Sequence, residues 1–183
     1  MKNESQRVGI FVDVQNLYYS ARALYDKRVN FGEILRMGTA ERQLVRAVAY
    51  TIRAESPEEQ SFFDALEKLG FEVRMKDLQT FVNGQKKGDW DVGIAVDVLK
   101  MSPKLDAVVL CSGDGDFEQL LYHIKAEGCR AEVISFGKST SARLRDEADD
   151  FTDLDSYSDS VLLGYKQPYK KQKPQESNLM DKE

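Results

Sequence analysis

Short apolar runs alternate with helical patterns along most of the chain. The runs at residues 8–13 and 106–111 consist mainly of apolar residues, many of them β-branched or aromatic. Such runs are typical of strands that are buried on both faces of a parallel sheet. Three further strands are expected, at residues 45–52, 71–75 and 130–135. Five strands separated by helices predict an α/β fold with a mostly parallel sheet covered on both faces, but leave the strand order open.

The helices between these strands are marked by the residues at their ends. Asn30 is a residue type that favours the N-cap of a helix, and Gly70 follows the end of another helical pattern. Asn83-Gly84 is typical of a tight turn and predicts a hairpin within residues 77–87. Helices are expected at residues 17–27, 31–37, 57–69, 89–101, 116–127 and 139–147.

The length and charge of the chain predict one domain followed by a tail. A chain of 183 residues that is 42% apolar and carries a net charge of −5 is ordinary for a globular domain. We expect this domain at residues 1–164, and a disordered, polar, basic tail at residues 165–183. The acidic domain argues against nucleic-acid binding through bulk charge. It does not exclude a nucleic-acid substrate, because a bound divalent cation would reverse the local field.

The N-terminal residues and the cysteines indicate a cytoplasmic protein. The polar start of the chain lacks the pattern of a signal peptide, and no apolar stretch is long enough to span a membrane. The two cysteines, Cys111 and Cys129, lack the spacing of a zinc site. They are expected to be buried free thiols in a reducing compartment.

Four aspartates stand where an α/β sheet would gather them. Asp13 ends the first apolar run, and Asp114 and Asp116 follow the run at residues 106–111. Asp91 opens a helical pattern. Ligands of open α/β sheets bind at the carboxyl ends of the strands, and carboxylates that converge there repel one another unless a cation lies between them. Oxygen ligands of this kind suit Mg²⁺ or Mn²⁺, so the sequence predicts a site for a hard metal ion.

Three polar residues near these aspartates have two interpretations each. Asn16 falls just before an expected helix, where it would either cap the helix or join the site. Asp97 lies about 120° round the helix from Asp91, so it either pairs with Lys100 or has a less direct role in the site. Ser112 could position a water molecule or bind a phosphate oxygen.

A site of this kind would hydrolyse a phosphodiester with the help of a metal ion. The ion polarises the scissile phosphate and lowers the pKa of a bound water. The sequence offers no Ser-His-Asp or Cys-His set as an alternative, and its one histidine, His123, is expected on a helix as a packing or surface residue. One of Asp114 and Asp116 could instead cap the helix that follows them.

Four segments in order, at residues 11–16, 87–97, 112–117 and 136–151, resemble the LabA-like branch of the NYN domains, which belong to the PIN-like nuclease superfamily. The resemblance covers residues 7–155. It implies a PIN-like three-layer α/β/α sandwich with a mostly parallel central sheet, and a Mg²⁺- or Mn²⁺-dependent endoribonuclease with an RNA substrate. It implies that the metal ligands are Asp13, Asp91, Asp114 and Asp116, and that the catalytic set adds Asn16 and Asp97.

Several residues outside the acidic set are expected to contact RNA. The hydroxyls of Ser139 and Ser141 lie near an expected helix start, where phosphates bind well. The alternative is that Ser139 or Thr140 caps this helix, and that Arg143 and Arg145 pair with acids nearby, Asp146 and Glu147. Further expected contacts are a phosphate oxygen for Ser112 and the RNA backbone for Arg143, Lys87 and the basic tail. Tyr18 and Tyr19 could stack on bases, but packing of at least one of them in the core is the favoured alternative.

Three other functions compete with a nuclease. The first is a binding or regulatory module that holds RNA or a protein on the same fold without cleaving it. A receiver-like phosphoacceptor is disfavoured because Asp13 ends its strand alone, without an acidic pair, and a haloacid-type phosphatase is disfavoured because Gln15 stands where a second acid is needed. The sequence leaves open the identity of the RNA, the number of metal ions, any protein partner, and whether the chain forms a homo-oligomer.

Overall fold

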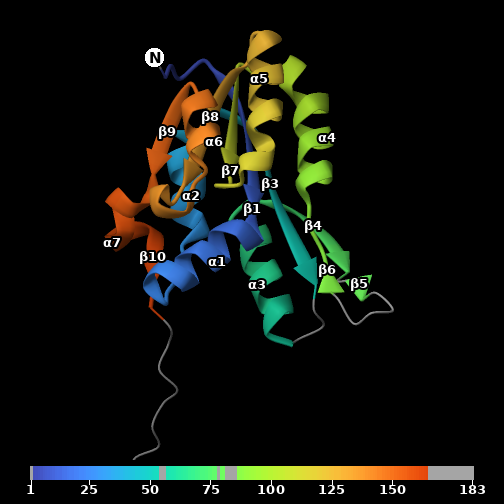
Figure 1. Ribbon diagram of the computed structural model, residues 1–183, viewed down its shortest axis with the longest axis vertical. Helices are drawn as coiled ribbons and strands as arrows, with labels where there is room; N and C mark the ends of the chain where they lie inside the picture. The colour runs from blue at the N-terminus through green and yellow to red at the C-terminus, as the bar shows by residue number, and fades with distance from the viewer. Residues whose placement is uncertain (1, 54–56, 78, 81–85, 165–183) are drawn as a thin grey trace, which may run out of the picture.

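The computed structural model describes residues 2–53, 57–77, 79–80 and 86–164 (Figure 1). Its centre is a six-stranded sheet in which every neighbouring pair of strands is parallel. The order of the strands across the sheet is β4-β3-β1-β7-β8-β9. These strands are β1 (Arg7–Asp13), β3 (Gln43–Arg53), β4 (Glu72–Asp77), β7 (Ala107–Cys111), β8 (Arg130–Ser135) and β9 (Asp150–Asp153).

Helices cover both faces of the sheet, as the buried side chains of β1 illustrate. Val8, Ile10 and Val12 face one apolar core together with residues of α1, α2 and α3, whereas Phe11 faces a second core with residues of α4, α5 and α6. The fold is therefore a PIN-like three-layer α/β/α sandwich, as predicted. The helices are α1 (Val14–Tyr25), α2 (Phe31–Thr39), α3 (Pro57–Lys68), α4 (Asp91–Met101), α5 (Glu118–Ala126), α6 (Ala142–Glu147) and α7 (Ser158–Val161).

The strand order creates a switch point between β1 and β7. After β1 the chain crosses through α1 and α2 to β3 on one side, whereas after β7 it crosses through α5 to β8 on the other. The connections that leave two neighbouring strands in opposite directions open a crevice at the carboxyl ends of those strands. Asp13 and the turn that follows Cys111 lie at this crevice.

All five predicted strands are present, but the sheet has a sixth that the sequence did not reveal. Strand β9, with the sequence Asp-Phe-Thr-Asp, is short, half-buried and lies at an edge of the sheet. A strand that is only half-buried needs no continuous apolar run. The sequence of β9 therefore lacks the apolar run by which the other strands were predicted. Two small antiparallel pairs complete the strands: β2 (Arg28–Val29) with β10 (Leu162–Leu163), and β5 (Gln79–Thr80) with β6 (Lys86–Lys87).

Four helices begin at residues other than those predicted: α4 and α5 begin two residues later, and α1 and α6 differ by three residues. Helix α1 starts at Val14, three residues early, because the side chain of Asp13 accepts the backbone N–H of Asn16 and caps the helix itself. The N-cap of α6 is Ser141, and neither Ser139 nor Thr140, because residues 137–139 form a separate 3₁₀ turn. The prediction for Asn30 is confirmed, since its side chain caps α2.

Parts of two predictions lie outside the described residues. Pairing of β5 with β6 confirms the hairpin, but the predicted Asn83-Gly84 turn is not among the described residues. The same is true of the tail at residues 165–183, so the division of the chain into a domain and a tail stays a prediction. None of the described helices has the length and hydropathy needed to cross a membrane.

Candidate metal centre

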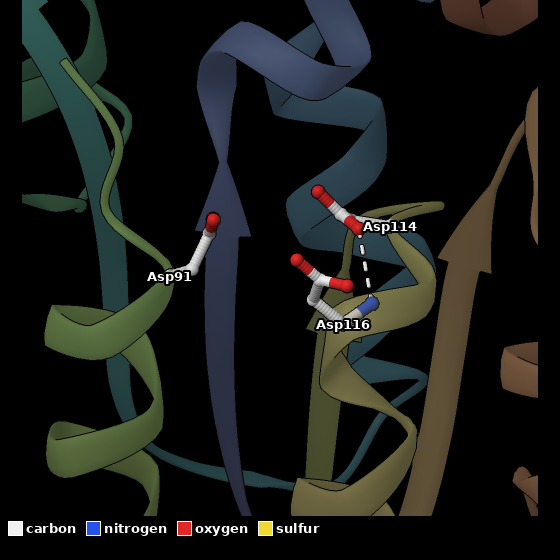
Figure 2. Close-up of side chains that lie close together, drawn as sticks. All are labelled: Asp91, Asp114 and Asp116. Atoms are coloured by element: carbon white, nitrogen blue, oxygen red, sulfur yellow. Dashed lines mark hydrogen bonds between the residues drawn. The ribbon is translucent and has the colours of Figure 1, made fainter. Parts of the chain in front are cut away.

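Three of the four predicted metal ligands converge at the crevice. Asp91, Asp114 and Asp116 each place a carboxylate oxygen within 4.8 Å of the other two, and Figure 2 shows their side chains turned toward one another. Asp91 is the first residue of α4, whereas Asp114 and Asp116 belong to the turn between β7 and α5. Three carboxylates at this spacing repel one another, and a divalent cation among them would remove that repulsion.

Asp114 also holds the turn in shape. Its side chain accepts the backbone N–H of Asp116 at 3.0 Å and so caps the 3₁₀ helix Gly115–Phe117. The predicted capping role therefore belongs to Asp114, which remains in the cluster (Figure 2). A Cβ atom at Gly115 would lie 2.8 Å from the Ser141 hydroxyl, so glycine allows the turn to pack closely against the segment before α6.

Asp13 lies beside the cluster and is held by two hydrogen bonds. Its carboxylate accepts the backbone N–H of Asn16 at 3.1 Å and the hydroxyl of Ser112 at 3.3 Å. The pKa of Asp13 is raised to about 6, mainly by burial and in smaller part by the charges of Asp91 and Asp114, against the lowering effect of these two hydrogen bonds. Asp13 therefore experiences the charge of the cluster, although the three-residue group does not include it.

Asn16 and Ser112 link β1 to the turn after β7. The side-chain oxygen of Asn16 accepts the backbone N–H of Gly113 at 2.9 Å, so Asn16 is not the helix cap. Ser112 is fully buried, and its hydroxyl donates to Asp13 while accepting the backbone N–H of Asp114 at 3.2 Å. Both side chains therefore fix the position of Asp114 relative to Asp13.

Asp13→Asn is expected to stabilise the metal-free protein increasingly as the pH rises. Because the folded-state pKa of Asp13 is about 6, against an ordinary value of 3.8, the folded protein binds this proton more tightly than the unfolded chain. The stability that this group contributes is thus present below pH 4 and is lost as the pH rises through 6. We expect the variant to gain up to about 2 kcal/mol over the wild type between pH 4 and pH 7, measured by urea unfolding in chelator.

Asn keeps the oxygen that accepts the N–H of Asn16, but its NH₂ group cannot accept the Ser112 hydroxyl, so the substitution removes the charge together with that hydrogen bond. Only the loss of the charge makes the gain depend on pH. Asp159→Asn, which removes an exposed carboxylate in the first turn of α7, is the control. A gain that is independent of pH, or equal in the control, would contradict the explanation by burial.

Asp91 is positioned by the tryptophan that precedes it. The indole N–H of Trp90 donates to the carbonyl of Thr51 at 2.7 Å, and its ring packs on Tyr50. A Cβ atom at Gly93 would lie 2.5 Å from this ring, so only glycine lets the ring lie against the first turn of α4. The sequence analysis missed this role, although the single tryptophan directly before an expected ligand was a signal for it.

Asp97 faces away from the cluster and binds two other side chains. Its carboxylate accepts the Tyr50 hydroxyl at 2.9 Å and the Arg74 guanidinium at 2.7 Å. The predicted pairing with Lys100 was therefore wrong, because Asp97 lies on the face of α4 that packs over β3 and β4. Its contact with Tyr50, on which Trp90 packs, connects it indirectly to Asp91.

The predicted RNA-contacting residues lie in different surroundings. Ser141 donates its backbone N–H to Gly113 at the acidic turn, whereas the Ser139 hydroxyl donates to Ser20 on α1. Arg143 is exposed on α6. The backbone of Lys87 lies in β6, but its side chain is outside the described residues.

The alternative pairing of the α6 arginines was wrong. Glu147 binds Lys125 at 2.9 Å, and the guanidinium of Arg145 lies over the ring of Phe151. His123 is exposed on α5, in agreement with its predicted surface position. Cys111 and Cys129 are buried free thiols, also as predicted.

The fold and the acidic crevice together define an α/β protein with a cluster of carboxylates at the switch point of its sheet. The chain belongs to the NYN domain family, whose model matches residues 7–155, and it is a LabA-like member. It is 31% identical over 157 residues to the low amplitude and bright protein LabA of Synechococcus elongatus, covering 81% of this chain and 83% of LabA.

A solved structure confirms the fold. A protein of unknown function from Vibrio parahaemolyticus is 36% identical to the chain and superposes with a TM-score of 0.81, covering 89% of this chain and 99% of that protein. The resemblance inferred from the four sequence segments is thus confirmed for the family and for the fold.

Proposed function

We propose that the protein is a Mg²⁺- or Mn²⁺-dependent endoribonuclease that hydrolyses phosphodiester bonds of RNA at the acidic crevice. The observation that carries the proposal is the convergence of Asp91, Asp114 and Asp116 within 4.8 Å. These carboxylates come from two separate elements and meet at the switch point of a nuclease-like fold. A turn or a cap would account for one of them, but not for all three together.

The chemistry of the donors suits a hard divalent cation. All three side chains offer only carboxylate oxygens, which are the ligands that Mg²⁺ and Mn²⁺ prefer. We propose Asp13 as a fourth ligand, because the charges of Asp91 and Asp114 already act on its carboxyl. When bound, such an ion would polarise the scissile phosphate and lower the pKa of a water molecule.

The other residues of the site would position these carboxylates and the RNA. Asn16 and Ser112 would hold the acidic turn beside Asp13, as their hydrogen bonds to that turn indicate. Asp97 would act indirectly, by holding the Tyr50 ring on which Trp90 packs. Contacts to the RNA backbone are proposed for Ser139, Ser141, Arg143 and Lys87. The contact predicted for Ser112 is not, because this side chain is fully buried and its hydroxyl is bound to Asp13 and to the backbone N–H of Asp114.

The test is cleavage of end-labelled RNA by the purified protein with Mg²⁺, with Mn²⁺ and with a chelator. Cleavage is expected with either ion, none with chelator, and recovery when the ion is restored in excess. Calorimetry with Mn²⁺ is expected to show binding in the same preparation. Mn²⁺ binding without cleavage of any RNA would contradict the nuclease and favour the binding or regulatory module on the same fold. Cleavage that persists in chelator would contradict the role of the metal.

A further inference from the structure

A groove of about 710 Å³ is lined by residues of α1 and α3, which lie next to each other and run in different directions in Figure 1. Buried residues such as Phe63 and Leu66 of α3 line it, together with Ile52 at the end of β3. Its volume is in the range of small-molecule and cofactor sites, which are mostly apolar with a few polar groups. None of the side chains assigned to the acidic site lines it.

The groove opens at the same edge of the sheet as the acidic crevice. Val14 and Gln15, which directly follow Asp13, line the groove. So does Thr51, whose carbonyl accepts the indole N–H of Trp90, the residue before Asp91. The groove therefore lies beside the segments that carry Asp13 and Asp91.

Aromatic rings surround the groove, and some of them are exposed. Tyr18 and Tyr19 of α1 lie edge to face, with their ring centroids 5.4 Å apart. On the other side, the ring of Phe62 contacts those of Phe31 and Phe63. Tyr19 is 60% exposed, so packing in the core does not account for its position. Exposed rings in a groove are a platform on which a flat apolar ligand can stack.

Among the described residues, the charged ones at the rim of the groove are two arginines and one acid. Arg22 donates to the Tyr18 hydroxyl, and Arg28 donates to the carbonyl of Gly164. The lining of the groove thus includes two guanidinium groups and one carboxylate, that of Glu59. A positive rim beside a crevice of carboxylates attracts a ligand that carries phosphate groups as well as flat rings.

We propose that this groove binds a single-stranded segment of RNA next to the phosphodiester that is cut at the acidic crevice, an inference that rests on the proposed function. A base of this segment stacks on Tyr19, and a backbone phosphate lies near Arg22 or Arg28. A duplex does not satisfy the groove, because its bases are already stacked on one another. The groove thereby selects single-stranded over double-stranded RNA.

The test is binding of a fluorescein-labelled, unstructured RNA of roughly 12 nucleotides in chelator, measured by fluorescence polarisation. Tyr19→Ala is expected to weaken binding about tenfold, and Tyr19→Phe to retain it. Tyr122→Ala is the matched control, since Tyr122 is 62% exposed but lies on α5 and does not line the groove. The corresponding duplex is expected to bind the wild type more weakly than the single strand.

A second variant tests the charge of the rim. Arg22→Gln is expected to lower the slope of log affinity against log salt by about 0.7, the share of one phosphate contact on a single strand. Arg36→Gln, which removes an exposed arginine of α2 outside the groove, is expected to leave the slope unchanged. An unchanged slope in Arg22→Gln would contradict the proposed contact between Arg22 and a phosphate of the RNA.

The groove and the proposed nuclease can fail separately. If the protein cleaves RNA, Tyr19→Ala is expected to raise KM about tenfold while kcat stays the same. If the protein binds single strands through Tyr19 but cleaves no RNA, the proposal for the groove is supported and the proposed nuclease activity is contradicted. Equal affinity of wild type and Tyr19→Ala, tighter binding of duplex, or no binding of the single strand would overturn the groove, whatever the cleavage assay shows.

Discussion

Asp114→Asn is expected to lower metal-dependent RNA cleavage on the order of 10³-fold, because it removes a charge from the centre of the acidic cluster. A metal ion contributes several kcal/mol of charge stabilisation to phosphoryl chemistry, and a neutral amide is a poorer ligand than a carboxylate. The measurement is kcat/KM on end-labelled RNA with Mn²⁺, compared with the wild type in the same buffer.

The fold is expected to survive this substitution. Asparagine keeps the side-chain oxygen that accepts the backbone N–H of Asp116, so the cap of the turn remains. Loss of one carboxylate also relieves repulsion with Asp91 and Asp116, and the melting temperature in chelator should be equal or higher. Asp114→Ala, by comparison, removes both charge and cap, and should cost about 1 kcal/mol of stability in addition.

Two results would contradict the assignment of the site. Cleavage by Asp114→Asn at the wild-type rate would show that the cluster does not carry the reaction, or that a contaminating nuclease cuts in both preparations. Loss of cleavage together with loss of folding would leave Asp114 with a structural role only. Circular dichroism of both variants separates these outcomes.

The buried strands could be predicted because each of them has a recognisable pattern of residues within its own segment. Residues 8–13 and 106–111 are mainly apolar because helices cover both faces of β1 and β7. Strand β9 has no such signal, because it is short, half-buried and at the edge of the sheet. Its position depends on pairing with β8, a contact that no local pattern encodes.

The acidic site was predictable in its position but not in its arrangement. Asp13 and Asp114 stand at or just after the ends of predicted strands. Because parallel strands end at the same edge of a sheet, the sequence pattern alone predicts that both residues lie at that edge. The pattern does not predict the strand order, which makes β1 and β7 neighbours in the sheet. Helical geometry correctly separated Asp97 from Asp91, but it could not show that Tyr50 and Arg74, from two other strands, face Asp97. The groove between α1 and α3 is equally a product of tertiary packing.

Arg42→Met is expected to lower the free energy of unfolding by about 3–5 kcal/mol without changing the chemistry of the site. Arg42 and Glu132 form a two-pronged ion pair in which both distances are 2.9 Å, and their side chains are 0% and 4% exposed. Removal of the arginine leaves the buried carboxylate of Glu132 short of a partner. It also removes the side-chain donor to the carbonyl of Gly38, near the end of α2, whereas the carbonyl of Thr39 keeps the backbone N–H of residue 42. Urea unfolding in chelator measures the loss.

The ion pair lies at the opposite edge of the sheet from the acidic crevice. Arg42 directly precedes β3, and Glu132 is near the start of β8, whereas Asp13 is the last residue of β1 and Asp114 lies in the turn after β7. We therefore expect kcat of the folded Arg42→Met protein to match the wild type at low temperature. A large drop in kcat with a small drop in stability would contradict this separation of the two edges.

Arg7→Met is the matched control, because Arg7 makes a similar two-pronged pair with Asp106 at the same edge, but both side chains are exposed. Exposed pairs contribute little, so its effect should be far smaller. Arg130 and Lys2 also approach Glu132, and in Arg42→Met they remain as its partners. If Arg130 and Lys2 suffice to compensate the charge of Glu132, Arg42→Met will lose as little stability as the control. If the cost of the buried charge dominates, adding Glu132→Leu to Arg42→Met will restore most of the stability, since an apolar pair carries no uncompensated charge.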